Sequence, residues 1–463
     1  MVMSENVKVS VILPSYNVGQ YIDECLQSVV NQTLLDIEII CVDADSVDGT
    51  KEIIGSHLSD SRVKLVTSQK KSYGYQVNLG MSLAHGEYVS VVETDDFIAA
   101  DMLEKLYSIA KKEDADIVKC GYYAFITGLD GKYLTNEVSL DREGIKSGGP
   151  FSFIDYCNKS QGTDPFIWNA LYKRSFLLDN AIFLNESPGA AFQDCGFRYQ
   201  VYACVDRAIY VDKAYYYYRR DNASSSMFNP KGLVFNYNEC SFLADKMQLA
   251  INGDNLKAHF IAETIIATML TSYRFCLLNH IKDEMLAETM NKFRGLIKQM
   301  LDSKALILDD LSENMKNEVL LLLDSYEKYA SFVEDKFSNL DKNATDFIAT
   351  IKKANGIVVF GAGKIGKSVY TWLVKNKICS DLSVCDNSPE LWGNEFFYTI
   401  VRSPEEVMVC DSKVFVLAAG KHNCEIKKQL VDSGIGEDRI VEYLYATHPL
   451  LCTGTMMDIF YSC

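Results

Sequence analysis

The sequence predicts an α/β protein in which a mostly parallel mixed sheet is flanked by helices, followed by a helical connector and a small Rossmann-like α/β domain. Three observations support this prediction. Short β-branched runs alternate with helical patterns over residues 1–125, long helical patterns without strands fill residues 230–345, and the β pattern returns at GIVVFGAGKIG. A chain of 463 residues also exceeds what one ordinary core holds.

The strands expected in the first part are apolar, β-branched runs between polar turns. They cover residues 9–13, 37–42, 63–66, 88–92 and 117–120. Apolar residues recur every three or four positions over residues 21–30, which predicts a helix between the first two strands. We expect a first domain at residues 1–228, the connector at 229–348, the second α/β domain at 349–450 and a tail at 451–463.

Composition excludes several classes of protein. Hydrophobic residues make up 48% and charged residues 23%, the balance of a soluble globular protein. The net charge of -16 argues against a nucleic-acid partner, because binding phosphates needs a basic surface. The cysteines form no CxxC pair and the first residues contain no apolar signal core, which predicts a cytoplasmic location. No stretch reaches the roughly 18 apolar residues of a membrane span, while peripheral association with the inner face of a membrane stays open.

Polar residues follow several of the predicted strands. Ligands of open α/β sheets bind beyond the carboxyl ends of the strands, so these residues are candidates for a site. An Asp-Asp pair such as Asp95 and Asp96 is usually a solvated turn or a helix cap. Here the pair follows the apolar strand YVSVV, where adjacent carboxylates repel unless a cation lies between them. A hard divalent ion shared with substrate phosphates would remove that repulsion.

The order of VSVILPSYN, CVDADSVDGT, VNLG with AHGEY, and ETDD over residues 9–96 resembles the amino-terminal half of family 2 glycosyltransferases of the GT-A fold. The resemblance implies transfer of a sugar from a nucleotide-diphosphate sugar to a saccharide or lipid-linked glycan, in surface polysaccharide or related glycan synthesis. It implies manganese or magnesium as the cofactor and Asp96 as its ligand. The implied contacts to the donor nucleotide are Pro14, Tyr16, Asn17, Asp43, Asn78 and Asp95.

Two positions depart from the family pattern. Many relatives have a second acid after the one at Asp43, where this chain has Ala44, so the donor base stays open. The first position of the metal motif, often Asp, is Glu93, which either reaches the same region or faces a neighbour.

The family's catalytic base matches Asp194 in FQDCGF. Inverting transfer needs a carboxylate that accepts the proton of the attacking hydroxyl. An isolated Asp before a helix is more often a cap, but the position of Asp194 after WNALYKRSF follows the family order. Four basic residues either add charge near the phosphates or are solvated, and solvation is favoured: Lys173, Arg174, Arg219 and Arg220. Trp168 and the tyrosines at 215–218 either stack on a sugar or pack in the core, and packing is favoured.

The second α/β domain carries GAGKIG, with Gly361, Gly363 and Gly366 directly after a strand and Asp386 twenty residues further on. This context matches the dinucleotide fingerprint, which predicts a bound nucleotide or NAD. A role in homo-oligomerisation fits the short segment equally well. Two alternatives for the whole chain stay open: an NAD-dependent sugar dehydrogenase or epimerase using GAGKIG, and a non-catalytic scaffold that senses nucleotides.

Overall fold

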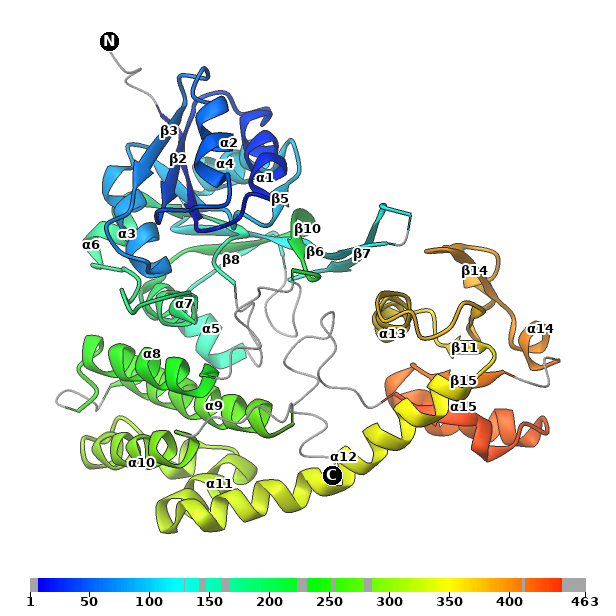
Figure 1. The fold of residues 1–463 in the computed structure, drawn as a ribbon. Helices are drawn as coiled ribbons and strands as arrows, with labels where there is room; N and C mark the ends of the chain where they lie inside the picture. Colours follow the sequence, from blue (N-terminus) through cyan, green and yellow to red (C-terminus); the bar gives the residue numbers. More distant parts are fainter. Residues whose placement is uncertain are drawn as a thin grey trace. The chain divides into compact units, whose positions relative to one another are not determined.

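The computed structural model describes residues 7–128, 130–140, 147–159, 166–190, 192–222, 231–250, 255–278, 285–409 and 413–443. The chain divides into two compact units, whose elements are labelled in Figure 1. The first comprises residues 1–123 and 137–329, and the second comprises residues 124–136 and 330–463. The division thus falls inside the long helix α12 (Tyr326–Lys353), and most of the helical connector groups with the first unit. The tail expected at 451–463 lies outside the described residues.

The first unit is built on a mixed sheet with the strand order β3-β2-β1-β4-β9-β6-β10-β5, with β7 beside β6 and β8 beside β10. Strands β1 to β4 run parallel, and β9 is antiparallel to its neighbours β4 and β6. The predicted fold class is therefore confirmed. The strands are β1 (Val9–Ser15), β2 (Ile37–Asp43), β3 (Val63–Thr67), β4 (Tyr88–Val91), β5 (Phe97–Ile98), β6 (Ile117–Thr127), β7 (Tyr133–Val138), β8 (Pro150–Phe151), β9 (Ala170–Lys173) and β10 (Ala208–Arg219).

The parallel strands sit in the interior because both of their faces are covered. Every residue of β1 and β2 is buried, which is why their sequences read as nearly continuous apolar runs. The register pairs Ser15 with Asp43 and Ile12 with Val91, so the loops after β1, β2 and β4 leave the sheet at the same edge. The helices of this layer are α1 (Ile22–Val30), α2 (Thr50–Ser56), α3 (Tyr73–Leu83), α4 (Met102–Glu113), α5 (Phe153–Lys159), α6 (Arg174–Asp179) and α7 (Gln193–Cys204).

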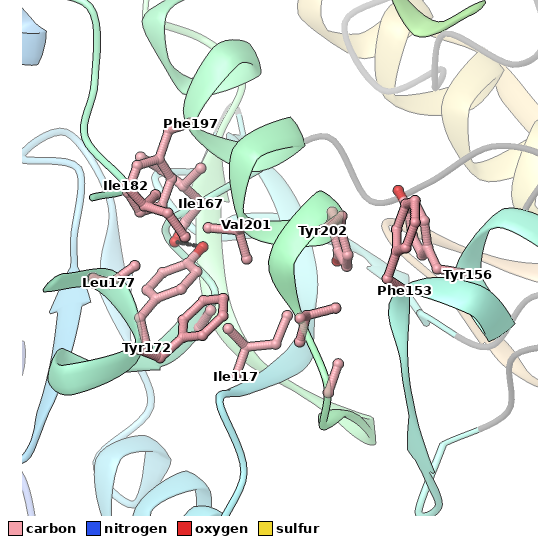
Figure 2. Packing of buried hydrophobic residues seen from close by; sticks show 14 of the residues in the cluster. Ile117, Phe153, Tyr156, Ile167, Tyr172, Leu177, Ile182, Phe197, Val201 and Tyr202 are labelled. Atoms are coloured by element: carbon pink, nitrogen blue, oxygen red, sulfur yellow. Dashed lines mark hydrogen bonds between the residues drawn. The ribbon is translucent and has the colours of Figure 1, made fainter. Parts of the chain in front are cut away.

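Helix α7 is fixed by an aromatic core, which Figure 2 shows from close by. Its Phe197 meets the ring of Tyr172 from β9 edge-on at 5.3 Å between centroids. Its Tyr202 stacks on Tyr156 from α5 at 4.1 Å and 7° between planes. The hydroxyl of Tyr172 donates to the carbonyl oxygen of Ile167 at 2.9 Å, so this polar group is satisfied inside the core. The packing fixes the direction of α7 and with it the position of its first turn.

The helices after β10 continue the first unit. They are α8 (Gly232–Lys246), α9 (Leu256–Leu278), α10 (Leu286–Asp302) and α11 (Glu313–Asp324). Arg274 of α9 forms a fully buried ion pair with Glu318 of α11, whose other oxygen accepts from the hydroxyl of Tyr329 at 3.2 Å. Residues 256–277 of α9 are long enough, and apolar enough on average, to cross a membrane by length and composition, although Lys257, Glu263 and Arg274 interrupt the apolar residues. Half of this segment is buried in the protein, as in a core helix.

The second unit contains a smaller sheet with the order β13-β14-β12-β11-β15-β16. All neighbouring pairs are parallel except β13 and β14. The elements are β11 (Ile357–Phe360), α13 (Lys364–Lys375), β12 (Leu382–Cys385), β13 (Glu395–Phe396), β14 (Thr399–Arg402), α14 (Pro404–Met408), β15 (Val414–Leu417), α15 (Asn423–Asp432) and β16 (Ile440–Glu442). Short 3-10 helices lie at Leu308–Asp310, Pro389–Leu391, Gly420–His422 and Glu437–Arg439.

Candidate functional site

Hydrogen bonds lock together the loops after β1 and β2. Ser46 donates to both carboxylate oxygens of Asp43, from its N–H at 2.9 Å and from its hydroxyl at 2.6 Å. The Ser46 hydroxyl oxygen accepts from the N–H of Asn17 at 2.9 Å, and the side-chain oxygen of Asn17 accepts from the N–H of Val47 at 3.0 Å. Asn17 has a φ of 51°, a conformation that Asn adopts more readily than most residues. Asn17 and Asp43 therefore meet, as expected, but they shape the two loops by bonding to them.

Two further side chains join these loops to their neighbours. Gln76 of α3 is buried and donates from Nε2 to the carbonyl oxygens of Ser15 at 2.9 Å and Val42 at 2.6 Å. The hydroxyl of Thr94 donates to the carbonyl oxygen of Pro14 at 2.9 Å, which ties ETDD to the first loop. Pro14 thus contributes its main chain to the frame. Gln76 was not predicted from the sequence, because nothing in the helical pattern of α3 shows that its amide faces two strand ends.

Tyr16 presents an open aromatic face at this edge. The residue is 45% exposed, and Lys71 Nζ lies 3.1 Å from its hydroxyl and 4.7 Å from its ring centroid. An exposed ring held by a neighbouring cation can stack on the planar face of a base or on the apolar face of a sugar. Among the expected donor contacts in the described loops, Tyr16 offers such a surface.

The two adjacent carboxylates of ETDD differ in what they contact. Asp96 is 1% exposed, and both of its oxygens accept bonds from β10: Oδ2 from the hydroxyl of Tyr216 at 2.8 Å and Oδ1 from the N–H of Arg219 at 2.7 Å. Burial, with the charge of Asp95 added, raises the pKa of Asp96 well above its usual value. Asp96 therefore anchors the turn after β4 to β10.

Asp95 is partly exposed, and its Oδ2 accepts from the side-chain amide of Asn222 at 2.8 Å. Its carbonyl oxygen accepts from Nε of Arg219 at 2.8 Å. Burial raises the pKa of the Asp95 carboxyl. Of the two neighbours, Asp95 is the carboxylate more accessible to a ligand. The Arg219 side chain is 7% exposed and its Nη2 also pairs with Glu24 at 2.6 Å, so it holds the turn.

Glu93 connects ETDD to Asp194. The hydroxyl of Tyr73 on α3 donates to Oε1 of Glu93 at 2.5 Å, which settles that this departure from the family pattern faces a neighbour. Burial raises the pKa of Glu93 to about 8, against the opposing effect of the Tyr73 bond. The N–H of Tyr73 also donates to the carbonyl oxygen of Gly189 at 2.9 Å, so Tyr73 joins Glu93 to the segment that leads into Asp194. The structure thus brings Asp194 and Asp95 to one edge of the sheet.

Asp194 lies in the first turn of α7. Burial raises its pKa, while the Arg198 guanidinium one helical turn later opposes that rise. The amino-terminal end of a helix favours negative charge, so the position supports an ionised carboxylate despite its burial. A carboxylate whose pKa is raised accepts a proton more readily than a free carboxylate, which is a property that a general base needs.

Glu239 of α8 was not singled out in the sequence. It is 3% exposed, and its Oε2 accepts from the amide of Asn185 at 3.1 Å. A Cβ added to Gly196 of α7 would lie 2.0 Å from its Oε1, so the glycine admits the carboxylate. Burial, opposed by the Asn185 bond and reinforced by the charge of Asp194, raises the pKa of Glu239 to about 8. The available signal was an acid on the face of α8 that also carries the apolar residues Leu233, Cys240 and Leu243.

Asn78 was expected to contact the donor nucleotide, but its side chain is bonded within the protein. Its side chain accepts from the N–H of Leu184 and donates to the carbonyl oxygen of the same residue, both at 2.9 Å. Nδ2 also lies 3.3 Å from Glu186 Oε1. These bonds hold α3 to the segment before α7, so a donor contact by Asn78 stays a prediction that this geometry does not favour.

The basic candidates separate by their place on the sheet. Lys173 pairs with Tyr88 at the beginning of β4, so it and Arg174 lie at the edge opposite to Asp95. Lys173 bonds Asp114 at 2.6 Å, and Nε of Arg174 donates to the carbonyl of Gly86 at 3.0 Å. Their position does not support the alternative in which either adds charge near the phosphates. Arg220 lies over the ring of Tyr218 at 4.8 Å from its centroid.

The aromatic residues near the site stack on one another. Trp168 lies 4.1 Å from Tyr216, 4.5 Å from Phe166 and 4.9 Å from Tyr218, measured between ring centroids. Trp168 and Tyr216 are buried. The favoured interpretation, that this group packs in the core, is confirmed for these two residues.

A divalent ion fits the acidic groups of this edge. In the described part of the chain no group of three or more His, Cys, Asp or Glu side chains could hold a metal by itself. Magnesium and manganese are often held by one or two carboxylates and by substrate phosphates, with water completing the shell. Asp95, which is partly exposed, is a carboxylate of that kind. The residues present therefore fit a metal brought in together with a diphosphate.

The four residues singled out in the second unit also come together. Gly361 follows β11 with a φ of 119°, and Gly363 precedes α13. Gly366 packs against Gly361, where an added Cβ would lie 1.7 Å from its carbonyl oxygen. Asp386, directly after β12, accepts from the N–H of Ala362 at 2.7 Å. Three of them, Gly361, Gly363 and Asp386, line one cleft.

Comparisons with known proteins agree with the site. The family described as Glycosyl transferase family 2 matches residues 10–179. Glycosyltransferase GlyG of Streptococcus pneumoniae is 31% identical over 224 residues, which are 47% of this chain and 72% of GlyG. The uncharacterized glycosyltransferase EpsJ of Bacillus subtilis is 29% identical over 46% of this chain and 61% of its own.

Among solved structures, S. aureus TarS aligns with a TM-score of 0.54 at 20% identity, over 71% of this chain and 55% of TarS. Its fragment in complex with UDP-GlcNAc gives a TM-score of 0.51 at 21% identity, over 69% of this chain and 92% of the fragment. This likeness supports the GT-A fold. The comparisons do not favour the dehydrogenase or epimerase alternative. The sequence match to GlyG and the family match to the strands that carry the site agree: this chain belongs to glycosyltransferase family 2.

Proposed function

We propose that this chain is an inverting glycosyltransferase that moves a sugar from a nucleotide-diphosphate sugar to a hydroxyl of a saccharide or lipid-linked glycan, in bacterial surface polysaccharide or related glycan synthesis. The observation that carries the proposal is that Tyr73 bonds both Glu93, in the turn that carries Asp95, and Gly189, in the segment that leads into Asp194. A donor-side carboxylate and a second carboxylate on a helix amino terminus are what displacement of a diphosphate by a hydroxyl requires.

The names of relatives support the polysaccharide setting. One relative, 35% identical over 116 residues, is a poly(ribitol-phosphate) beta-glucosyltransferase of Bacillus spizizenii. The match covers 24% of this chain and 18% of that protein, so it supports the reaction class of the first unit alone. The donor base stays open because Ala44 replaces the second acid of the loop after β2. Association with the inner face of a membrane and with a second copy of the chain stay predictions.

In the proposed reaction, the loops after β1 and β2 hold the nucleotide, with Tyr16 against its base and the frame around Asp43 setting the shape. Asp194 accepts the proton of the acceptor hydroxyl as that oxygen attacks the anomeric carbon opposite to the diphosphate. A bound manganese or magnesium ion would neutralise charge on the departing diphosphate. Asp95 would hold that ion, and Asp96 would hold Asp95 in place through Tyr216 and Arg219.

The base is tested with Asp194→Asn. A thermal-shift screen of nucleotide sugars with manganese first identifies the donor, because a ligand of the folded state raises the melting temperature. We expect Asp194→Asn to lower transfer at least 100-fold, the lower end of what a general base contributes, while donor affinity changes less than threefold. Asp179→Asn, an exposed acid at the end of α6, is the matched control. Transfer that survives in Asp194→Asn would exclude this residue as the base.

The division between Asp95 and Asp96 is tested by comparing Asp95→Ala with Asp96→Ala. Asp95→Ala should remove the part of donor binding that depends on manganese and leave the melting temperature nearly unchanged. Asp96→Ala leaves two buried donors without acceptors, which costs about 1–3 kcal/mol for each donor. If folded Asp96→Ala loses the manganese-dependent binding while Asp95→Ala retains it, the ligand is Asp96, as the family resemblance implies.

A further inference from the structure

The second unit contains a cleft of about 580 Å³ that plays no part in the proposed transfer reaction. Cavities that hold small ligands commonly measure about 300–1,000 Å³. This one lies at the carboxyl ends of β11, β12 and β15, where the strand order reverses because β11 has β12 on one side and β15 on the other. Such a reversal opens a crevice between loops that leave the sheet in opposite directions, and open α/β sheets bind ligands there.

The three positions of GAGKIG that carry glycine differ in whether the fold requires glycine there. Gly361 has a φ of 119°, and an added Cβ would lie 2.7 Å from the carbonyl oxygen of Ala418, so the turn itself requires glycine. Gly366 is required by its contact with the main chain of Gly361. Gly363 has a φ of -77° and a ψ of -163°, which any residue adopts, and no atom lies within 4 Å of an added Cβ. Nothing in the fold therefore requires glycine at position 363. A side chain there would extend into the open space of the cleft.

The groups around this space match the parts of a nucleotide. Helix α13 has 12 residues, its first N–H groups have no acceptors in the helix, and no described side chain caps it. These amides and the helix dipole favour a phosphate group. Asp386 accepts one N–H on each oxygen, from Ala362 at 2.7 Å and Ser388 at 2.9 Å, which leaves lone pairs for sugar hydroxyls. Apolar wall is supplied by Phe360, Ile365, Ala418, Ala419 and Ile426.

We propose that this cleft binds one nucleoside phosphate, with the phosphate over Gly363 at the start of α13, the ribose at Asp386 and the base against the apolar wall. The limit to one nucleotide follows from the sheet. On the far side of β11 the described residues supply only β15 and β16, whereas a dinucleotide site uses a second set of three strands. This site is independent of the transfer reaction proposed for the first unit.

The proposal is tested on the full chain by hydrogen exchange measured by mass spectrometry, which reports on each unit separately. ADP, GDP, CDP and UDP are added in turn in the presence of EDTA, so that metal-dependent binding at ETDD does not contribute. Adenosine, uridine, pyrophosphate and NAD are the comparison probes. We expect at least one nucleoside diphosphate to protect residues 361–367 and 386–388, and the nucleoside without phosphate to bind at least tenfold more weakly.

Gly363→Val should weaken this protection at least tenfold without changing the melting temperature, because an added Cβ at this position meets no protein atom within 4 Å. Gly295→Val is the matched control, since an added Cβ in this exposed turn of α10 also meets nothing within 4 Å. The proposal is overturned if no diphosphate protects these segments, or if Gly363→Val binds as tightly as the wild type. Tighter binding of NAD than of every mononucleotide would overturn the assignment of a single nucleotide. Pyrophosphate that binds as tightly as the nucleoside diphosphates would overturn the proposal that the cleft recognises a nucleoside.

Discussion

Replacing Glu239 with glutamine removes a buried carboxylate from beside the first turn of α7 and keeps its shape. Glu239 is 3% exposed, and burial is the first cause that raises its pKa, from 4.5 to about 8. The glutamine oxygen can still accept from Asn185, and the side chain still fits against Gly196. The substitution therefore changes the ionisation of this position more than its packing.

The sign of the effect follows from where the proton is held. Between pH 4.5 and 8 the folded protein keeps the proton on Glu239 while the unfolded chain releases it, so stability falls as the pH rises. This contribution to stability is fully present below pH 4.5, the pKa of the unfolded chain. It is lost as the pH approaches about 8, the pKa in the folded protein. At about 1.4 kcal/mol per pH unit, the wild type loses about 3 kcal/mol between pH 5 and pH 8 from this group, and Glu239→Gln loses none of it.

Urea unfolding of both proteins at pH 5, 6, 7 and 8 measures this difference. The free energy of unfolding of the variant, relative to that of the wild type, should rise steadily from pH 5 to pH 8. The difference should level off above pH 8. Asp60→Asn is the control, because the Arg62 bond lowers the pKa of Asp60 and its contribution is already complete above pH 5. A difference between wild type and Glu239→Gln that is the same at pH 5 and pH 8 would refute the assignment of a protonated Glu239.

Three further predictions test packing within the first unit. Glu318→Ala leaves Arg274 charged and buried, so it should cost about 3–5 kcal/mol in urea unfolding, and a loss below 1 kcal/mol would contradict the ion pair. Gly74→Ala places a Cβ 1.9 Å from the carbonyl oxygen of Asn185 and should cost about 1–3 kcal/mol, whereas Gly295→Ala meets nothing and should stabilise by up to about 1 kcal/mol. Equal effects of the two glycine changes would show that α3 yields freely. Gln76→Leu leaves two strand-end carbonyls without their amide donor and should lower both stability, by about 1–3 kcal/mol, and donor affinity; unchanged affinity would separate Gln76 from the site.

The parallel part of the sheet was predictable because both of its faces are buried. Strands β1, β2 and β4 read as apolar runs, and the rule that ligands bind beyond strand ends then located Asn17, Asp43 and Asp95. Strand β10 was not predicted, although it has 12 residues. Its exposed middle carries Asp212 and Lys213, and its partners lie far away in the sequence, so local pattern does not identify it.

The supporting residues were missed for a different reason. Gln76 and Glu239 are polar side chains on helices, where sequence periodicity indicates a face but not the group that it meets. Gln76 acts because α3 crosses the ends of β1 and β2. Glu239 lies beside the first turn of α7 because Gly196 leaves room for its carboxylate. Each role depends on packing between elements, which a single sequence does not encode in any local pattern.

The pair Asp95 and Asp96 shows where motif reasoning ends. The motif fixes that two adjacent carboxylates follow a buried strand, and adjacent residues at a turn point in different directions. Which one stays accessible is decided by β10, which returns from residue 208 to 219 and supplies the Tyr216 hydroxyl and the Arg219 N–H to Asp96. Since Asp96 is 1% exposed whereas Asp95 is partly exposed, the strand leaves Asp95 as the more accessible carboxylate. The same local sequence with a different strand in the place of β10 would assign the two roles the other way.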